Sequence, residues 1–270
     1  MSRWIASFGM YDRVELQPAN DALWDAVAAH LRAAGVADVP DRLDRSRSLH
    51  DIWSDPALLV AQCCGYPMTT AYAGRVRYLA TPIYLAAGCD GVRHRSRLIV
   101  RIDDEREALS AFRGAIAAVN QWDSNTGMNL LRAAIARLAP IGPFFNYVIE
   151  TGSHADSARA IALGRADIAA VDAVSYAHLE RYEPDVTSKL RTVGWTDLTP
   201  GLPFVTSVRT SQADTAALIR ALRAAVRSPD VRAACDVLRL DDVRQIGSSR
   251  YDAILTFEKR AIRAGYPTLA

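Results

Sequence analysis

The stretch 151–172 constrains the fold more than any other part of this 270-residue chain. It reads as a Thr-Gly-Ser-His turn, a short helix with small apolar residues on one face, a glycine stop, and an apolar strand at 168–171 that ends at Asp172. Ser153 is a good helix N-cap, and an all-apolar strand is typical of a sheet covered on both faces. The stretch therefore predicts an α/β fold, with Ser153 and His154 at a helix N-terminus and Asp172 at the carboxyl end of a strand, where open α/β sheets bind ligands.

The helix start at Ser153 and His154 is expected to bind an anion, with His154 either donating to the anion or serving only as a capping or packing histidine. The first N–H groups of a helix have no acceptor within the helix, and they lie at the positive end of its dipole. For Asp172 the sequence leaves two interpretations. It caps a helix that starts near Val174, or it accepts a hydrogen from a protonated oxyanion or an amine and so disfavours a fully ionised anion such as sulfate.

A second loop carries residues for the same chemistry. Asp-Ser-Asn-Thr-Gly at 123–127 leads into a helix expected at 128–138. Ser124 and Asn125 suit the cap, Thr126 adds a hydroxyl, and the glycine lets the backbone approach a ligand. The loop is either a plain N-cap or an oxyanion site that needs no basic residue. It is not a P-loop, because the Gly-Lys-Ser/Thr ending is absent.

Other polar residues carry weaker signals. Tyrosines follow predicted strands in the first part of the chain, and they either close over a ligand or pack at a sheet edge: Tyr11, Tyr66 and Tyr84. The remaining histidines form no ligand pattern and are expected at the surface: His30, His50, His94 and His178. The four cysteines suggest buried free thiols, or a bridge between Cys64 and Cys89. No metal-ligand set, cofactor motif or nucleophile elbow is present in the sequence, so we expect no cofactor.

Strands alternate with helices along the chain, which predicts the α/β class with largely parallel sheets. We expect strands at 5–8, 58–62, 76–82, 83–87, 98–102, 115–119, 144–149, 168–171 and 205–208, a weak edge strand at 36–43, and helices at about 20–34, 49–53, 105–113, 128–138, 154–163, 174–182, 212–227, 229–238 and 251–264. A polar link at 91–97 and a proline-containing segment at 193–205 are interpreted as crossings between two lobes. Lobe 1 is then 1–94 with 203–270, and lobe 2 is 95–202.

The composition is that of an ordinary soluble globular protein. Half of the residues are hydrophobic, 23% are charged, and the net charge of +2 gives no case for nucleic-acid binding. No apolar run is long enough to span a membrane. The first ten residues lack the apolar core of a signal peptide, so as written the chain is expected in the cytoplasm, or in the periplasm if a leader was removed.

Taken in order, these motifs resemble the phosphate/phosphite/phosphonate binding proteins of ABC transporters. The resemblance runs from Phe8 to about Val208 and rests on Cys-Gly-Tyr-Pro at 64–67, Ser-Asn-Thr-Gly at 124–127, Thr-Gly-Ser-His at 151–154, Gly-Arg-Ala-Asp-Ile-Ala-Ala-Val-Asp at 164–172 and Pro-Gly-Leu-Pro at 200–203. It implies a type II periplasmic-binding-protein fold, with two α/β lobes, two or three crossovers and a ligand cleft between the lobes.

The resemblance also implies roles by position. Phosphoryl oxygens would be held by Ser124, Asn125, Thr126, Ser153 and His154, a ligand proton or amine would be accepted by Asp172, and the opposing lobe would contribute Tyr11, Tyr66 and Tyr84. Asn125 stands where the family's loop usually has a hydroxyl residue, which is expected to alter oxyanion preference. The implied partner is an ABC transporter membrane subunit, or none if the protein is a solitary sensor.

Two classes of function are compatible with these features. The first is a non-enzymatic binding protein that closes on a phosphorus oxyanion by hinge motion. The alternative is an enzyme on the same two-lobed fold that acts on a small anionic metabolite, with His154 or a cysteine as its catalytic group. The lack of an activated nucleophile, a metal set or a cofactor motif in the sequence favours binding.

Overall fold

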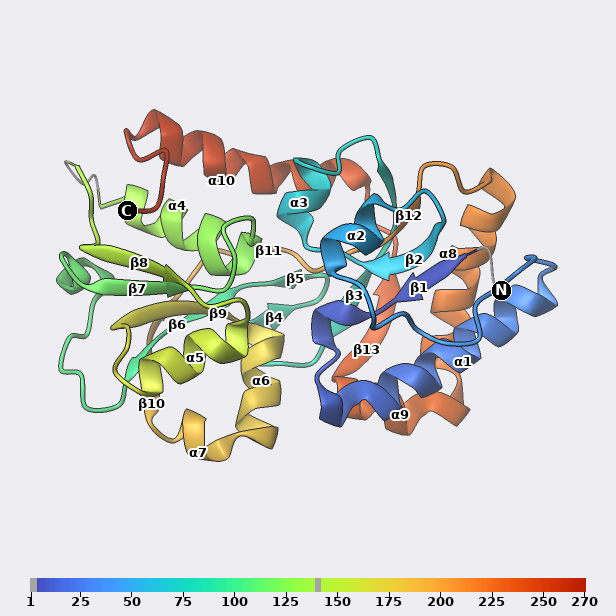
Figure 1. The fold of residues 1–270 in the computed structure, drawn as a ribbon, viewed down its shortest axis with the longest axis horizontal. Coiled ribbons are helices and arrows are strands. Elements are labelled where there is room, and N and C mark those ends of the chain that lie inside the picture. Colours follow the sequence, from blue (N-terminus) through green and yellow to red (C-terminus); the bar gives the residue numbers. More distant parts are fainter. Residues whose placement is uncertain (1–3, 139–141) are drawn as a thin grey trace. The chain divides into compact units, whose positions relative to one another are not determined.

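The chain folds into two compact units, and the computed structural model describes residues 4–138 and 142–270 (Figure 1). Unit 1 comprises Met1–Leu85 and Pro200–Arg250, and unit 2 comprises Ala86–Thr199 and Tyr251–Ala270. Among the described residues, the chain therefore passes from one unit to the other after residues 85, 199 and 250. These boundaries differ from the predicted lobes, because 86–94 and 251–270 belong to unit 2 and 200–202 belongs to unit 1.

Unit 1 is built on a five-stranded sheet with the strand order β1-β2-β12-β3-β13. β1 and β2 are parallel, whereas β12 is antiparallel to both of its neighbours. The middle of this sheet is therefore filled by β12, which the chain supplies only after it returns from unit 2. The elements are β1 (Ile5–Ser7), α1 (Gln17–Ala33), α2 (Leu49–Ser54), β2 (Leu58–Gln62), α3 (Gly65–Thr69), β3 (Val76–Tyr84), β12 (Phe204–Ser207), α8 (Gln212–Arg227), α9 (Arg232–Leu238) and β13 (Leu240–Arg244).

The core of unit 1 forms around its central strands β2 and β12, whose residues are all buried. Every residue of β2 is buried, and α1 packs against α8 and α9. Phe8 contacts Trp24 of α1 and Phe204 of β12, with edge-to-face ring geometry in both pairs. These contacts join the first and last segments of the unit.

Unit 2 contains a five-stranded sheet with the order β10-β6-β9-β7-β8 and a small sheet with the order β11-β5-β4. β7 is parallel to β8 and β9, and β6 is antiparallel to β9 and β10. The elements are β4 (Cys89–Asp90), β5 (Arg93–His94), β6 (Ser96–Arg101), β7 (Ile116–Val119), α4 (Leu130–Ala136), β8 (Tyr147–Glu150), α5 (His154–Ala162), β9 (Ile168–Asp172), α6 (Ala173–Tyr182), α7 (Pro184–Thr187), β10 (Leu190–Trp195), β11 (Thr199–Pro200) and α10 (Asp252–Arg263).

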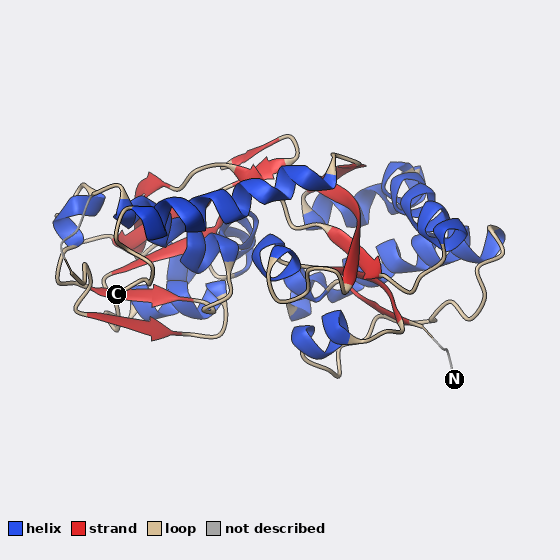
Figure 2. Ribbon diagram, turned by 90° about the horizontal axis from the view of Figure 1, so that it is seen from above, coloured by secondary structure: helices blue, strands red, loops and turns tan. Residues whose placement is uncertain are grey.

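The terminal helix α10 packs on α4, which is why 251–270 belongs to unit 2 and not to lobe 1 (Figure 2). Arg132 of α4 donates a hydrogen bond to the carbonyl oxygen of Pro267 (2.9 Å). The carbonyl oxygen of Ala270 accepts from the backbone N–H groups of Phe144 (2.6 Å) and Phe145 (3.0 Å). The last residues of the chain are thus bonded to the segment just before β8.

The α/β class and most predicted elements are confirmed, and β2 and α8 have the predicted bounds. The expectation of largely parallel sheets is wrong, because both five-stranded sheets are mixed. The weak strand at 36–43 is absent, and the segment is a loop whose Val39 and Pro40 carbonyl oxygens accept from Arg32. β10 and β13 were not predicted.

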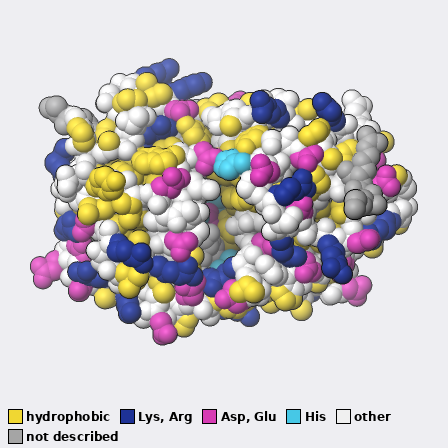
Figure 3. Space-filling model, viewed as in Figure 1, with side chains coloured by type: hydrophobic (Ala, Val, Ile, Leu, Met, Phe, Trp, Pro, Cys, Tyr) yellow, Lys and Arg dark blue, Asp and Glu magenta, His cyan; other side chains and the backbone are white. Residues whose placement is uncertain are grey.

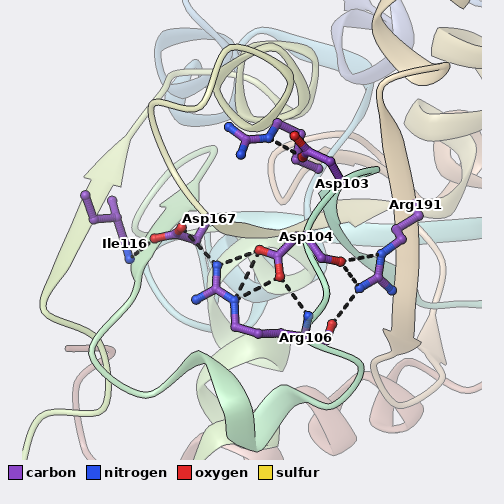
Figure 4. A network of polar contacts seen from close by, with 7 residues as sticks. Asp103, Asp104, Arg106, Ile116, Asp167 and Arg191 are labelled. Atoms are coloured by element: carbon purple, nitrogen blue, oxygen red, sulfur yellow. Dashed lines mark hydrogen bonds and ion pairs between the residues drawn. The ribbon is translucent and has the colours of Figure 1, made fainter.

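The helix predicted at 105–113 is also wrong, because only a 3₁₀ turn forms there, at Leu109–Phe112. A network of charges holds the segment before this turn (Figure 4). Arg106 pairs with Asp104 and, at 3.0 Å, with Asp167, whose other oxygen accepts from the backbone N–H of Ile116 (2.7 Å). These side chains connect the loop to the beginnings of β7 and β9, an arrangement that a continuous helix would break.

Two further expectations are corrected. His94 and His178 are buried and not at the surface, because β5 and α6 direct them into unit 2. All four cysteines are free, so Cys64 and Cys89 do not pair. Among the described residues, the structure has no helix with both the length and the apolar character needed to cross a bilayer.

Candidate functional site

The loop after β7 starts its helix with a widened turn. Ser124 caps this start, because its hydroxyl accepts a hydrogen bond from the Gly127 N–H (3.0 Å). Asn125–Asn129 then forms a π turn, in which the Asn129 N–H reaches back to the Ser124 carbonyl oxygen (2.9 Å), before α4 continues as an α-helix. Single π turns inside helices occur frequently at functional sites. Ser124, Asn125 and Thr126 are all buried.

Gly127 is required for close packing of this loop. A Cβ atom at this position would lie 1.7 Å from Oδ1 of Asn120 and 3.2 Å from the Ser124 hydroxyl. The carbonyl oxygen of Asn120 accepts a hydrogen bond from Gly152 N–H (2.8 Å). Asn120 therefore contacts both predicted anion-binding loops, 124–127 and 151–154.

The start of α5 has the predicted cap. The Ser153 hydroxyl accepts from the Asp156 N–H (3.0 Å) and donates to the Asp156 carboxylate (2.7 Å). The same reciprocal arrangement begins α2 with Ser48 and Asp51, and α8 with Ser211 and Asp214. The structure thus shows Ser153 as a capping residue, as at two other helix starts of the chain.

His154 joins the two helix starts. Its Nε2 lies 3.1 Å from the Thr126 hydroxyl, and its Nδ1 lies 3.5 Å from the backbone nitrogen of Asp172. Desolvation lowers the pKa of His154 to about 4, with an opposing effect from the negative charge of Asp172. The imidazole is therefore neutral at pH 7, so it takes part in hydrogen bonds without bringing a charge.

Asp172 is engaged on both carboxylate oxygens. Oδ1 accepts from the N–H groups of Val174 (3.0 Å) and Ser175 (2.9 Å), so Asp172 caps α6, which is one of the two interpretations left open by the sequence. Oδ2 lies 2.9 Å from Nδ1 of His94, and both side chains are almost fully buried. Burial opposes ionisation, but His94 and the capping N–H groups hold the pKa of Asp172 well below its usual range.

The importance of His94 was missed in the sequence. His94 lies on β5, between Arg93 and Arg95 in the sequence. Nothing in this local sequence distinguishes it from a surface residue. Its contact with Asp172 arises only when β6 pairs with β9 and places Ser96 opposite Asp172. The contact of His94 with Asp172 could therefore be predicted only if the pairing of β6 with β9 were already known.

The tyrosines belong to unit 1. The rings of Tyr11 and Tyr84 lie edge to face, 5.3 Å apart, and the Tyr84 hydroxyl accepts from the Gln62 side chain (2.6 Å). Both tyrosines line a cavity of about 10 Å³, room for about one water molecule. Tyr66 is buried separately, on the short helix α3. The structure thus brings two of the three predicted tyrosines together.

Two of the four thiols, Cys89 and Cys235, do not resemble catalytic nucleophiles. Burial, with a contribution from Asp172, raises the pKa of Cys89 to about 12, and burial also raises the pKa of Cys235. A nucleophilic cysteine needs the opposite shift, because the thiolate is the reactive form. Among residues 4–138 and 142–270, no cluster of three or more acidic, histidine or cysteine side chains is arranged to hold a metal ion.

The surface charges are mixed. On the face drawn in Figure 3, acidic and basic side chains are interspersed, in agreement with the net charge of +2. The described side chains of that face do not gather into the broad basic area that nucleic-acid binding requires.

Two α/β units, joined by repeated crossovers, define the class of two-lobed periplasmic binding proteins, and solved structures of that class are similar to this chain. A binding-protein component of a phosphonate ABC transporter from Pseudomonas aeruginosa has a TM-score of 0.77 at 15% identity, covering 97% of this chain and 86% of its own. PhnD1 from Prochlorococcus marinus, in complex with methylphosphonate, has a TM-score of 0.74 at 12% identity, covering 97% and 100%. A Xanthomonas citri protein bound to ATP has a TM-score of 0.72 at 16% identity, covering 98% of each chain.

The chain belongs to the family of phosphonate ABC transporter periplasmic substrate-binding proteins, whose model matches residues 61–251. The resemblance and the two-lobed fold expected from the sequence are thereby confirmed. The family consists of solute-binding proteins and not of enzymes, which decides against the enzymatic alternative. No curated protein matches the chain.

Proposed function

We propose that this protein binds a small phosphorus oxyanion (phosphate, phosphite or a phosphonate) at the paired helix starts of unit 2. The observation that carries the proposal is the 3.1 Å contact between Thr126 and His154, which brings the loop before α4 to the N-terminus of α5. Two helix N-termini so joined offer backbone N–H groups and hydroxyls to one anion. The ligand contacts are proposed to come from Ser124, Asn125, Thr126, Ser153 and His154.

Asp172 is proposed to set the protonation state that the site accepts. The pKa of Asp172 lies well below its usual range, so the carboxylate is ionised, and its negative charge, which also acts on His154, opposes a fully ionised ligand. A ligand that keeps a proton or carries a cationic group is favoured over sulfate. In this proposal Asp172 acts mainly through its charge, because both of its oxygens are engaged within unit 2.

Tyr11, Tyr66 and Tyr84 of unit 1 are proposed to contribute to recognition of the ligand's organic group. Amphipathic phenol rings suit a group such as a phosphonate alkyl chain. The proposed partner is an ABC transporter membrane subunit, with the binding protein in the periplasm, where the family acts. A solitary sensor is the other arrangement compatible with the same site.

The proposal is tested by isothermal titration calorimetry with phosphate, phosphite, methylphosphonate, aminoethylphosphonate and sulfate. We expect binding of at least one phosphorus oxyanion in preference to sulfate. Thr126→Val and His154→Gln should each weaken binding by at least about tenfold, since each removes a charge-assisted or bridging hydrogen bond. His30→Gln, a change at an exposed histidine of α1, is the matched control. Lack of binding of every phosphorus oxyanion would refute the proposal.

A further inference from the structure

A chain of buried side chains runs from the loop before α4 to two crossover segments. The Asn125 side chain donates from Nδ2 to the Thr199 hydroxyl (3.0 Å) and accepts at Oδ1 from Nδ2 of Asn129 (3.1 Å). Asn129 also donates to the carbonyl oxygen of Ile254 (3.2 Å) and accepts at its own Oδ1 from Arg132 (2.8 Å). Asn125, Asn129 and Thr199 are each at most 1% exposed.

The ends of this chain lie where the polypeptide changes unit. Thr199 is the last residue of unit 2 before the chain enters unit 1 at Pro200. Ile254 is in the first turn of α10, just after the chain re-enters unit 2 at Tyr251. The proposed anion-binding loop is thus hydrogen-bonded to both of these crossover segments through one pair of asparagines.

The orientation of the Asn125 and Asn129 side-chain amides is fixed by neighbouring groups that can only donate or only accept a hydrogen bond. Arg132 can only donate and the Ile254 carbonyl can only accept, so Asn129 must present Oδ1 to the first and Nδ2 to the second. Nδ2 of Asn129 then requires Oδ1 of Asn125, which leaves Nδ2 of Asn125 to face Thr199. A buried amide that loses such a partner is left with an unsatisfied polar group, which is costly.

We infer that Asn125 and Asn129 are positioning residues that couple the anion-binding loop to the crossover segments at Thr199 and α10. The inference rests on the proposed function of this loop and refines it. The Asn125 side chain serves the crossovers, whereas its backbone N–H remains a proposed ligand contact. Asn125 therefore does not set oxyanion preference through its side chain. Ligand occupancy and the conformation of the two crossover segments change together.

The first experiment needs no ligand. Unfolding free energies are measured by urea denaturation for Asn125→Ala, Thr199→Val and the double variant. If the two side chains act as a unit, the double variant loses less stability than the sum of the single changes. Thr206→Val, at a buried threonine of β12 in unit 1, is the control and should add to Asn125→Ala. Additive losses for Asn125 and Thr199 would overturn the inference.

The second experiment measures ligand affinity by calorimetry, with the phosphorus oxyanion that the wild-type protein binds. Asn125→Ala and Thr199→Val should each weaken binding by about five- to twentyfold, with no further loss in the double variant. Thr199→Ser, which keeps the hydroxyl, should restore wild-type affinity. The order of preference among phosphate, phosphite and methylphosphonate should stay unchanged in every variant. A changed order in Asn125→Ala alone would show direct ligand contact and overturn the inference.

The third experiment measures amide hydrogen exchange in the two crossover segments. In the wild-type protein, ligand should slow amide hydrogen exchange in peptides that cover 196–202 and 251–258, and this protection should diminish in Thr199→Val and Asn129→Leu respectively. Protection that is unchanged in both variants would contradict the coupling. If the wild-type protein binds no phosphorus oxyanion, the proposed function fails, and the ligand-free stability measurements still decide whether the asparagine chain is a coupled unit.

Discussion

At the scale of single residues, unit 2 buries Asp172 in contact with two histidines. Asp172 lies against His94 on one side and offers its backbone N–H to His154 on the other. A buried carboxylate that loses a hydrogen-bonding partner is destabilised, because its charge is left with less compensation. The buried charge of Asp172 therefore depends on His94 and on the capping N–H groups of α6.

Replacement of Asp172 tests this dependence. Asp172→Ala removes the α6 cap and the partner of His94, and should lower the free energy of unfolding by about 3–5 kcal/mol. Asp172→Asn keeps an acceptor for the capping N–H groups and should cost less. Urea denaturation measures both, with Asp156→Ala, an exposed position, as the control. Equal losses for Asp172→Ala and Asp156→Ala would contradict the buried arrangement.

The pH dependence of stability should report on His154. Its pKa is about 4 in the folded protein and 6.5 without the fold, so the unfolded chain binds the extra proton first as the pH falls. Stability is therefore full above pH 6.5 and decreases between pH 6.5 and 4, by about 1 kcal/mol per pH unit at the steepest point. Urea denaturation across this range should give a flatter profile for His154→Gln. An unchanged profile in that variant would assign the effect to another group.

The residues of the candidate site divide into those that local sequence reveals and those that it does not. Ser124, Ser153 and Asp172 lie at helix starts, and their capping roles follow from short motifs. His94 and Asn129 carry no such motif. They matter only because strand pairing and helix packing bring them to partners far away in sequence.

At the scale of elements, three helices begin with the same serine and aspartate pair, which gives a matched comparison. Ser153→Ala and Ser211→Ala should each lower the free energy of unfolding by about 1 kcal/mol, because each removes one cap. Only Ser153→Ala should also weaken binding of the phosphorus oxyanion. Urea denaturation and calorimetry separate the two effects. Equal ligand affinities in the two variants would restrict Ser153 to a capping role.

Elements with a clear period or a clear cap were predictable, and elements held by tertiary charges were not. β2 is apolar from Leu58 to Ala61, and α8 has a serine cap and a regular apolar face, so both were placed correctly. β13 mixes acidic and basic residues with two buried ones, so its alternation is weak. At 105–113, the pairing of Arg106 with Asp167 outweighs local helix propensity, and no local pattern reveals it.

At the scale of the whole molecule, the division into two units was predictable, but the assignment of the C-terminal helix was not. The sequence of an amphipathic helix reveals its apolar face, but it does not reveal which element packs against that face. Helix α10 was therefore placed with its neighbours in sequence, whereas its partner is α4. The two-lobed organisation itself followed from the ordered motifs and is confirmed by the family and by the similar structures.

Removal of Tyr251–Ala270 tests the assignment of the C-terminal segment. The truncated chain loses α10, the Pro267 acceptor of Arg132 and the Ala270 acceptor of Phe144 and Phe145. Amide exchange should become faster in α4 and β8 of unit 2, while β2 of unit 1 keeps its protection. Exchange measured by mass spectrometry resolves the two units. Faster exchange in β2 alone would place the segment with unit 1.

The position of β12 in the middle of the unit 1 sheet has a consequence for biosynthesis. Its neighbours β2 and β3 leave the ribosome long before Phe204–Ser207 is made, and all the strands of the larger sheet in unit 2 are translated in between. Until then, β2 lacks one of its two final neighbours and β3 lacks both, since β13 is made later still. The sheet of unit 1 is therefore the first to be started and the last to be completed. Unit 1 can fold fully only after every strand of the larger unit 2 sheet has been synthesised.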